Sequence, residues 1–298
     1  MKEFYAHGKL LISGEYLILD GAKGLALPTK KGQRLIVSQY HIKELHWESY
    51  DYQNQCWFTM RCDLDFNLLV TSDSTTAQHL ISLLTHINQL NPHLFTQGYH
   101  LKTYLEFPRL WGLGSSATLI STLAQWAQID PFLLLNGRFK GSGYDIACAT
   151  ANSALVYQLN AGQPMITSIN FNPEFNDHLF FVYLNQKQLS SESIKAYNNL
   201  QFDKATAIEQ INTITEGLIQ SKDLNTFQTL LEQHEAIMAQ LLKTPSIKEL
   251  YFKDYPGVVK SLGAWGGDFV LLCGPKKTPS YVIEKGFDIV IPFRDMVF

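Results

Sequence analysis

The sequence contains few cysteines and no CxxC pair. The four thiols are scattered along 298 residues, at Cys56, Cys62, Cys148 and Cys273. This pattern argues against a zinc ribbon, a thioredoxin motif or a disulfide-stapled secreted domain. We therefore expect reduced thiols and a cytoplasmic protein.

Long apolar runs are also missing. No stretch approaches the roughly 18 apolar residues that a membrane-spanning helix needs. Polar and small residues, among them Lys9 and Glu15, interrupt the apolar run near the start, so we do not interpret it as a signal peptide. We expect no membrane partner.

The sequence also lacks a large excess of charge of either sign. The formal net charge is -3, and only 17% of the residues are charged. Such a chain lacks the basic field that holds nucleic acid. We therefore expect a small-molecule partner and no nucleic acid, and either a monomer or a homodimer.

The length and the 46% hydrophobic content fit a globular protein of two domains. The first sixty residues favour strands, because LLIS, YLIL, RLIVSQY, ELHWESY and CWFTM are apolar or alternating. Apolar residues at helical spacing predict helices over Thr76–Leu90 and Ser116–Ala127. A strand is predicted over Tyr99–Phe107.

The pattern changes after about Leu179. From there the chain reads strand, three helices, two strands, helix, strand, which suggests a split βαβ sandwich. The clearest helix is Asp223–Leu242, and the last strand is DIVIPF. We predict an α+β protein with domains at residues 1–170 and 171–298.

The stretch WGLGSSATLI, residues 111–120, places glycines and serines between a predicted strand and a predicted helix. Glycines let the backbone approach an anion, and a helix N-terminus carries unpaired N–H groups and partial positive charge. Two other interpretations of this segment stay open. It also fits the looser dinucleotide fingerprint GxGxxA, and a tight turn into a buried helix would look similar. It is not a Walker A loop, because no GK[ST] follows.

Two further blocks accompany this stretch, AHGKLLISGEY near the start and KSLGAWGGDFVLLCG near the end. In this order and at these separations, the three blocks resemble the GHMP family of small-molecule kinases over nearly the whole chain. Ala6–Lys9 is similar to that family's A-P-G-K motif, with His7 in place of proline. Gly14–Tyr16 is similar to the phosphomevalonate kinase form of the same motif.

The later blocks carry the same resemblance. Gly141–Asp145 stands where the family has its S-G-x-D aspartate, and the spelling GYDIACA resembles a bacterial subgroup. Gly263–Asp268 resembles the third motif G-A-G-G-G-D, with Trp265 replacing a glycine. The resemblance implies a ribosomal protein S5 domain 2-like N-terminal domain and a ferredoxin-like C-terminal domain.

The resemblance also implies roles for particular residues. Asp145 would accept the proton of the acceptor hydroxyl, and Lys9 would hold that carboxylate ionised. Ser116 would contact Mg²⁺. The ATP phosphates would lie on Gly112, Leu113, Gly114, Ser115, Ser116 and Ala117. The acceptor would meet the third motif at Gly263, Ala264, Gly266 and Gly267, and the pair Ser190 and Ser191 before a helix.

Each role has a structural alternative. Asp145 is also a favourable helix N-cap, Ser190 and Ser191 could be a plain N-cap pair, and Lys9 could be a solvated strand-end lysine. The glutamate that mevalonate kinases use to bind magnesium is missing before Asp145, where Asp130 is the one other acid and matches poorly.

The histidines predict no metal site. Several recur at intervals of seven, namely His79, His86, His93 and His100. The first two would lie two helical turns apart, about 10 Å, which is too far to share an ion.

The residues and the resemblance together predict a kinase that phosphorylates phosphomevalonate or mevalonate with ATP and Mg²⁺. Within the family, a sugar kinase and a diphosphomevalonate decarboxylase are alternatives. A non-catalytic ligand-binding protein is an alternative of another class, favoured by His7, Trp265 and the missing glutamate. A nicotinamide-dependent enzyme is a weaker one.

Overall fold

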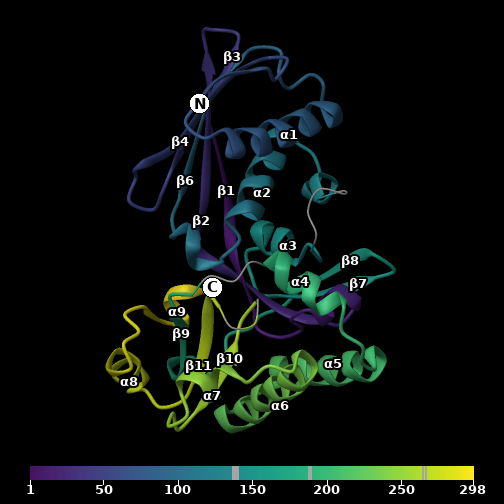
Figure 1. Cartoon of the computed structure of the whole chain (residues 1–298), viewed down its shortest axis with the longest axis vertical. Helices are drawn as coiled ribbons and strands as arrows, with labels where there is room; N and C mark the ends of the chain where they lie inside the picture. The colour runs from purple at the N-terminus through teal and green to yellow at the C-terminus, as the bar shows by residue number, and fades with distance from the viewer. Residues whose placement is uncertain (136–140, 187–189, 264, 266) are drawn as a thin grey trace. The chain divides into compact units, whose positions relative to one another are not determined.

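The computed structural model describes residues 1–135, 141–186, 190–263, 265 and 267–298, with only the backbone of residues 190–193 (Figure 1). These residues form two compact units. Unit 1 comprises Met1–Gly8, Lys31–Arg109 and Leu113–Thr150, and unit 2 comprises Lys9–Lys30, Leu110–Gly112 and Ala151–Phe298. Strands β1 (Lys2–Leu11) and β2 (Gly24–Tyr40) run from one unit into the other. The predicted domain boundary at residue 170 stays a prediction.

Unit 1 contains a sheet with the strand order β5-β4-β3-β6-β2. Strands β3 and β6 run parallel, whereas β3–β4, β4–β5 and β2–β6 are antiparallel pairs. The strands are β3 (Glu44–Tyr50), β4 (Cys56–Asp63), β5 (Leu68–Thr71) and β6 (Gly98–Leu105).

Helices α1 (Ser74–Leu90) and α2 (Ser115–Ala127) lie on one side of this sheet (Figure 1). Their apolar residues form one core with the inward side chains of the strands, such as Trp47 on β3, Leu84 on α1 and Leu123 on α2. No described helix of unit 1 lies over the opposite face in Figure 1. Side chains on that face therefore meet solvent while their sequence neighbours are buried. The same unit also contains η3 (Pro131–Leu135) and α3 (Tyr144–Thr150).

The predicted helices of this unit are confirmed, and β6 confirms the predicted strand from residue 99. The carboxylate of Asp73 caps α1 by accepting a hydrogen bond from the backbone N–H of Thr76. The predicted strand YLIL is wrong, because these residues form the 3-10 helix η1 (Leu17–Asp20) in unit 2. The positive φ angles of Gly14 (90°) and Tyr16 (57°) turn the chain there, so the apolar run cannot stay extended.

Unit 2 contains an antiparallel sheet with the order β10-β11-β9-β12. Its strands are β9 (Leu179–Tyr183), β10 (Val258–Ser261), β11 (Phe269–Cys273) and β12 (Val290–Pro292). The first three are buried along their whole length. The sequences of β9 and β11 are accordingly apolar throughout, whereas β10 also buries Lys260 and Ser261. The hairpin β7 (Leu155–Asn160) and β8 (Gln163–Ser168) pairs through β7 with the first residues of β2.

The helices of unit 2 are α4 (Ser190–Asn198), α5 (Lys204–Gln220), α6 (Leu224–Leu242), α7 (Ile247–Tyr251), α8 (Thr278–Glu284) and α9 (Phe293–Met296). Short 3-10 segments occur at η2 (Arg109–Trp111) and η4 (Asn176–His178). The predicted order of elements is confirmed except that it missed α7 and α9. The predicted strand DIVIPF is shorter than expected, because its last residue, Phe293, begins α9.

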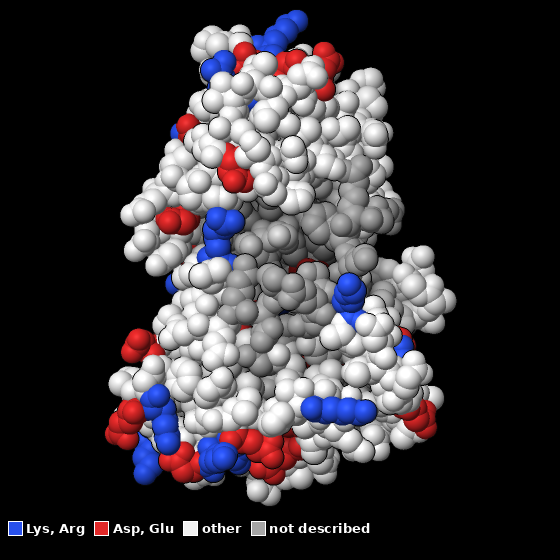
Figure 2. Space-filling view, in the orientation of Figure 1, with Lys and Arg blue, Asp and Glu red and all other residues white. Residues whose placement is uncertain are grey.

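The surface charge agrees with the small net charge of the sequence. On the face drawn in Figure 2, the acidic (red) and basic (blue) side chains are intermixed. Among the residues that the structure describes, none of the four cysteines forms a disulfide; Cys56 is exposed and the other three are buried. In the described part of the chain, no helix is both long enough and apolar enough to cross a lipid bilayer.

Candidate active site

The glycine-serine loop ends at the N-terminus of α2. Gly112 and Gly114 have φ angles of 65° and 87°, which L-residues rarely adopt, and Gly114 is the N-cap of the helix. Because glycine has no side chain, the cap leaves the first N–H groups of α2 without a capping acceptor. Backbone donors and the positive end of the helix dipole therefore favour an anion at this point.

A pocket of about 640 Å³ adjoins this helix start within unit 1. Its lining includes the hydroxyl residues Ser115 and Ser116 of α2 and the indoles of Trp47 and Trp57. The guanidinium of Arg109 lies 3.6 Å from the centre of the Trp57 ring. The volume is in the range of small-molecule sites, and aromatic walls suit a flat heterocycle. A phosphorylated heterocyclic ligand would match both the loop and the pocket.

Two side-chain hydrogen bonds connect polar residues that line the inner surface of the pocket. The indole Nε1 of Trp47 donates to Ser49 Oγ at 2.9 Å, and Thr103 Oγ1 donates to the same oxygen at 3.0 Å. These residues come from β3 and its neighbour β6. Sequence reasoning did not identify this pocket. The alternation of ELHWESY, which places Trp47 and Ser49 on the buried face of a strand, was the available signal.

The structure removes the basis of the dinucleotide interpretation. That interpretation requires a second strand after the glycine-rich helix. The segment that follows α2 is instead the 3-10 helix η3. Asp130 is exposed and its Oδ1 accepts the N–H of Phe132 at 2.9 Å, so it caps this turn.

Asp145 and Lys9 lie in different units. Asp145 is half-buried in the first turn of α3, after Gly143 with φ 87°, and its Oδ1 accepts the N–H of Ile146 at 3.0 Å. Asp145 therefore lies within α3 and is not its N-cap, because the helix begins one residue earlier, at Tyr144. Lys9 is half-buried on β1 in unit 2.

The first and third motifs are joined inside unit 2 by buried charges. The ammonium of Lys260 forms an ion pair with Glu15 Oε1 and lies 3.2 Å from Glu235 Oε1 on α6. Ser261 Oγ donates to the other oxygen of Glu235 at 3.0 Å, and the Gly14 N–H donates to Nε2 of His234 at 3.0 Å. Glu15 of the first motif is therefore a structural residue.

The pKa values in this cluster reflect burial and pairing. Burial raises the pKa of Glu235 to about 7, and Lys260 only partly opposes this effect. Burial acts in the same direction on Glu15, but Lys260 and His234 outweigh it and hold the pKa of Glu15 below its ordinary value. The lowered pKa of Glu15 favours its charged form beside Lys260, whereas the raised pKa of Glu235 favours its protonated form more than in an ordinary glutamate.

Trp265, which replaces a glycine of the third motif, is anchored at both ends. Its backbone N–H donates to the hydroxyl of Tyr16 at 3.0 Å, and its indole Nε1 donates to the carbonyl of Pro245 at 3.3 Å. Tyr16 in turn stacks on Tyr197 of α4, with ring centres 5.3 Å apart. Trp265 is therefore held in place by hydrogen bonds beside the first motif.

The first glycine of the phosphate loop meets the last residue of the third motif. A Cβ at Gly112 would lie 2.1 Å from Oδ2 of Asp268, so any other residue would require this carboxylate to move. The backbone of Asp268, with φ 55°, is fixed by its N–H to Gln186 O (2.7 Å) and its carbonyl to Leu184 N–H (2.8 Å). The second and third motifs thus touch in unit 2, a contact that no sequence spacing reveals.

The remaining predicted residues are placed only in part. Leu113 is buried and Ala117 lies buried in the first turn of α2. Gly263 has φ 68° and Gly267 is buried. Ala264 and Gly266 lie outside the described residues. Ser190 and Ser191 begin α4, and their side chains also lie outside the described part.

The chain was compared with known proteins. No protein-family model matches the sequence, and no curated protein matches it significantly. Solved structures do match over nearly the whole chain. The Streptococcus pneumoniae phosphomevalonate kinase, in complex with phosphomevalonate and AMPPNP, is 18% identical, with a TM-score of 0.71 and coverage of 98% of this chain and 99% of that chain.

Two other solved structures extend the match. The Methanococcus jannaschii mevalonate kinase is 14% identical, with a TM-score of 0.70 and coverage of 97% and 96% of the two chains. The Lactococcus lactis galactokinase complexed with galactose is 12% identical, with a TM-score of 0.64 and coverage of 95% and 88%. The predicted α+β architecture and the resemblance are confirmed at the level of the fold: the chain has the fold of the GHMP kinases.

Proposed function

We propose that this protein is an ATP-dependent kinase of a small-molecule acceptor. The observation that carries the proposal is the glycine-capped N-terminus of α2 beside the aromatic pocket of unit 1. The base of the nucleotide would occupy the pocket between Trp47, Trp57 and Arg109. Its phosphates would bind the backbone of Gly112–Ala117, where the helix dipole favours negative charge.

A magnesium ion would accompany the nucleotide. The hydroxyl of Ser116 lines the pocket at the helix start and is the kind of oxygen ligand that Mg²⁺ takes alongside phosphate oxygens and water. Asp130 does not fit as a ligand, because its carboxylate caps its own turn. When bound, the ion would neutralise charge on the phosphates.

The chemistry would fall to two residues. Phosphoryl transfer requires positioning and charge stabilisation more than covalent catalysis. Asp145 would accept the proton of the acceptor hydroxyl, and the Lys9 ammonium would keep that carboxylate ionised and stabilise the transferring group.

Phosphomevalonate or mevalonate is the acceptor we propose. The spelling GEY at Gly14–Tyr16 and the aspartate that ends the third motif support this choice. Among the structural neighbours, one is a phosphomevalonate kinase with phosphomevalonate bound. The acceptor would meet Gly263, Ala264, Gly266 and Gly267, together with Ser190 and Ser191. The protein would act in the cytoplasm.

The first experiment measures ATP consumption with magnesium and a panel of acceptors. The panel holds mevalonate, phosphomevalonate, diphosphomevalonate and several sugars. Turnover with mevalonate or phosphomevalonate supports the proposal, and turnover with a sugar alone would keep the kinase and replace its substrate. Release of CO2 from diphosphomevalonate would identify a decarboxylase. ATP binding without turnover of any acceptor would favour the non-catalytic alternative.

The second experiment tests the proposed base. Asp145→Asn should lower kcat by about 10²- to 10⁴-fold, because the hydroxyl proton loses its acceptor, while the Kd for ATP stays close to that of the parent protein. Asp130→Asn is the matched control and should keep full activity, since Asp130 only caps a turn. Equal kcat values in the two variants would remove Asp145 from the mechanism.

A further inference from the structure

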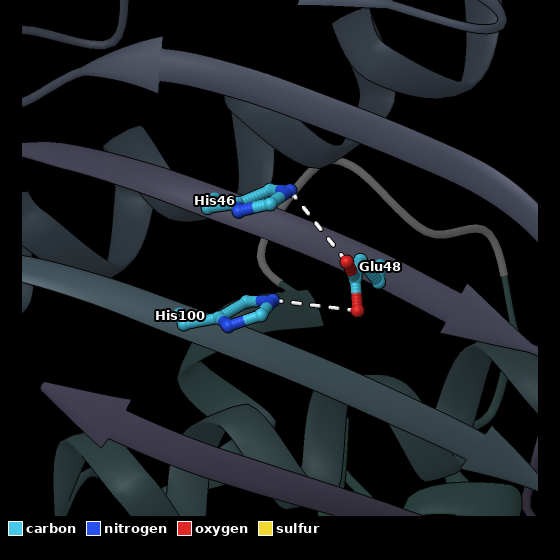
Figure 3. Close-up of side chains that lie close together, drawn as sticks. All are labelled: His46, Glu48 and His100. Carbon is cyan, nitrogen blue, oxygen red and sulfur yellow. Dashed lines mark ion pairs between the residues drawn. The ribbon is translucent and has the colours of Figure 1, made fainter. Parts of the chain in front are cut away.

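Three metal-type ligands gather on the outer face of the unit 1 sheet. His46 and Glu48 belong to β3, and His100 belongs to the neighbouring strand β6 (Figure 3). One ligand atom from each residue lies within 4.8 Å of the other two. The pocket proposed for the nucleotide uses the opposite side of the same strands, through Trp47 and Ser49. The cluster is therefore separate from the proposed active site.

The strand register explains why these residues meet. In the parallel pair β3–β6, His46 stands opposite His100 and Glu48 opposite Lys102. Residues i and i+2 of a strand point to the same face, and adjacent strands are about 4.8 Å apart. The sheet itself thus sets the spacing of His46, Glu48 and His100, and no flexible loop is involved.

The distances resemble those between ligands of one ion. Nε2 of His46 lies 3.7 Å from Oε1 of Glu48, and Nε2 of His100 lies 3.3 Å from Oε2. Two ligand atoms bound to a tetrahedral zinc at about 2.05 Å are separated by about 3.3 Å. The longer distance exceeds an ordinary hydrogen bond. Nε2 of His100 is buried and has no hydrogen-bond partner among the described residues.

Both imidazoles point in the same direction. Their rings are stacked, with centres 4.4 Å apart and planes 5° apart, and both Nε2 atoms face the carboxylate of Glu48 (Figure 3). Two nitrogens and a carboxylate oxygen on a single side of a narrow space form the donor set of many three-residue zinc sites. The three side chains are 18% to 27% exposed, so the cluster lies close to solvent.

The two carboxylate oxygens of Glu48 have different surroundings. The hydroxyl of Tyr50 and the ammonium of Lys102 lie 2.8 and 2.9 Å from Oε2, whereas Oε1 faces Nε2 of His46 at 3.7 Å. The ammonium of Lys102 is an obstacle to metal binding, since it lies 2.9 Å from Glu48 Oε2 and would compete with an ion.

We propose that His46, Glu48 and His100 bind a divalent transition-metal ion of the zinc class, with water completing a tetrahedral site. The ion would join β3 to β6 on the solvent face of the sheet. Tyr50, whose hydroxyl donates to Glu48 Oε2 at 2.8 Å, would orient the carboxylate. The site is independent of the proposed kinase activity.

The test is a titration of the metal-stripped full-length protein, free of any histidine tag. Co²⁺ is the probe, because a tetrahedral site gives it a strong visible absorption band, and Zn²⁺ should displace it. The expected result is one ion per chain. His46→Gln and His100→Gln should each weaken binding at least about tenfold, because each removes a nitrogen ligand. His93→Gln, which changes an exposed histidine of a loop, is the matched control and should bind as the parent does.

A fourth variant separates a metal site from a mere polar patch. Lys102→Met removes the competing ammonium and should tighten metal binding, although it breaks the ion pair with Glu48. Circular dichroism and the metal-free Tm check that each variant folds. The proposal is overturned if the folded parent gives no tetrahedral Co²⁺ band, or if the His93 variant loses as much affinity as the His46 and His100 variants. Weaker binding by Lys102→Met would also count against it.

Discussion

Histidine, glutamate and lysine side chains cluster in both units of the described structure. In unit 2, Glu15, His234, Lys260 and Glu235 are buried, with side-chain exposures of 0% to 7%. In unit 1, His46, Glu48, His100 and Lys102 lie on an open sheet face with exposures of 18% to 34%. The residue types are the same, and the surroundings differ.

The difference shows how burial determines what such a cluster can do. A buried charge is stable only when it is paired, so Lys260 keeps its ion pairs with Glu15 and Glu235. These ion pairs join the first motif to the block that contains the third. A half-exposed cluster has water as an alternative partner, so its contacts can open and an ion can enter. The buried cluster is suited to hold structure, and the open one to exchange ligands.

The sharpest way to break this comparison is to remove one lysine from each cluster. Lys260→Met leaves Glu15 and Glu235 without their buried partner and should lower the free energy of unfolding by about 3–5 kcal/mol. Lys102→Met, in metal-free protein, should change it by no more than about 1 kcal/mol, since its pair is partly exposed. Urea denaturation measures both. Equal losses would mean that burial does not distinguish the clusters.

A second measurement uses pH. Burial raises the pKa of Glu235 from its ordinary 4.5 to about 7, so between these values the folded state holds a proton that the unfolded state has lost. Glu235 should therefore make the protein less stable as pH rises from 4.5 to 7. Glu235→Gln should remove this contribution while keeping an acceptor for Ser261.

Glu48 should have the opposite effect on the pH dependence of stability. Its pKa lies below the ordinary value, so its stabilising contribution is present above pH 4.5 and is lost as the pH falls through the lowered pKa. Glu48→Gln should therefore reduce the pH dependence of the free energy of unfolding only below about pH 4.5. The free energy of unfolding of both variants and of the parent protein can be measured from pH 3 to 8. If both variants differed from the parent in the same pH range, the contrast between the two clusters would be wrong.

The smallest expected effect compares a crowded glycine with an open one in unit 2. Gly112→Ala would place a methyl group against the carboxylate of Asp268, whereas Gly162, with φ 77° in the β7–β8 turn, has nothing within 4 Å. Gly162→Ala should cost roughly 1 kcal/mol of backbone strain. Gly112→Ala should cost about 2 kcal/mol or more, because the same strain is joined by the clash. Similar losses in chemical denaturation would mean that Asp268 can move aside freely.

Much of the fold could be predicted because it depends on local patterns. The apolar periodicity of Thr76–Leu90 and the glycines before Ser115 determine elements whose position the structure confirms. The YLIL segment was predicted wrongly because its composition favours a strand, while two positive φ angles around Glu15 impose a turn. Propensity does not report such backbone conformations.

The site was less accessible to sequence reasoning. Motif resemblance selected Gly112–Ala117 and Asp145, and their roles stay predictions. The contacts that join the motifs, such as Glu15 with Lys260 and Gly112 with Asp268, link residues more than 150 positions apart along the chain. The even spacing of histidines directed attention to the α1 helix, whereas His46 and His100 come together only through the strand register.

That register has a consequence for how the chain reaches its native state. The pairing of β3 with β6 is parallel, and β4, β5 and α1 lie between the two strands along the chain. Equivalent positions such as Ser49 and Thr103 are 54 residues apart. Closing a segment of this length costs more chain entropy than closing the β3–β4 hairpin, so we expect β3 to pair with β6 more slowly than with β4. A bound ion bridging His46 and His100 would therefore stabilise a non-local junction of the sheet, and would slow the separation of β3 from β6 if the ion binds only after the strands have paired.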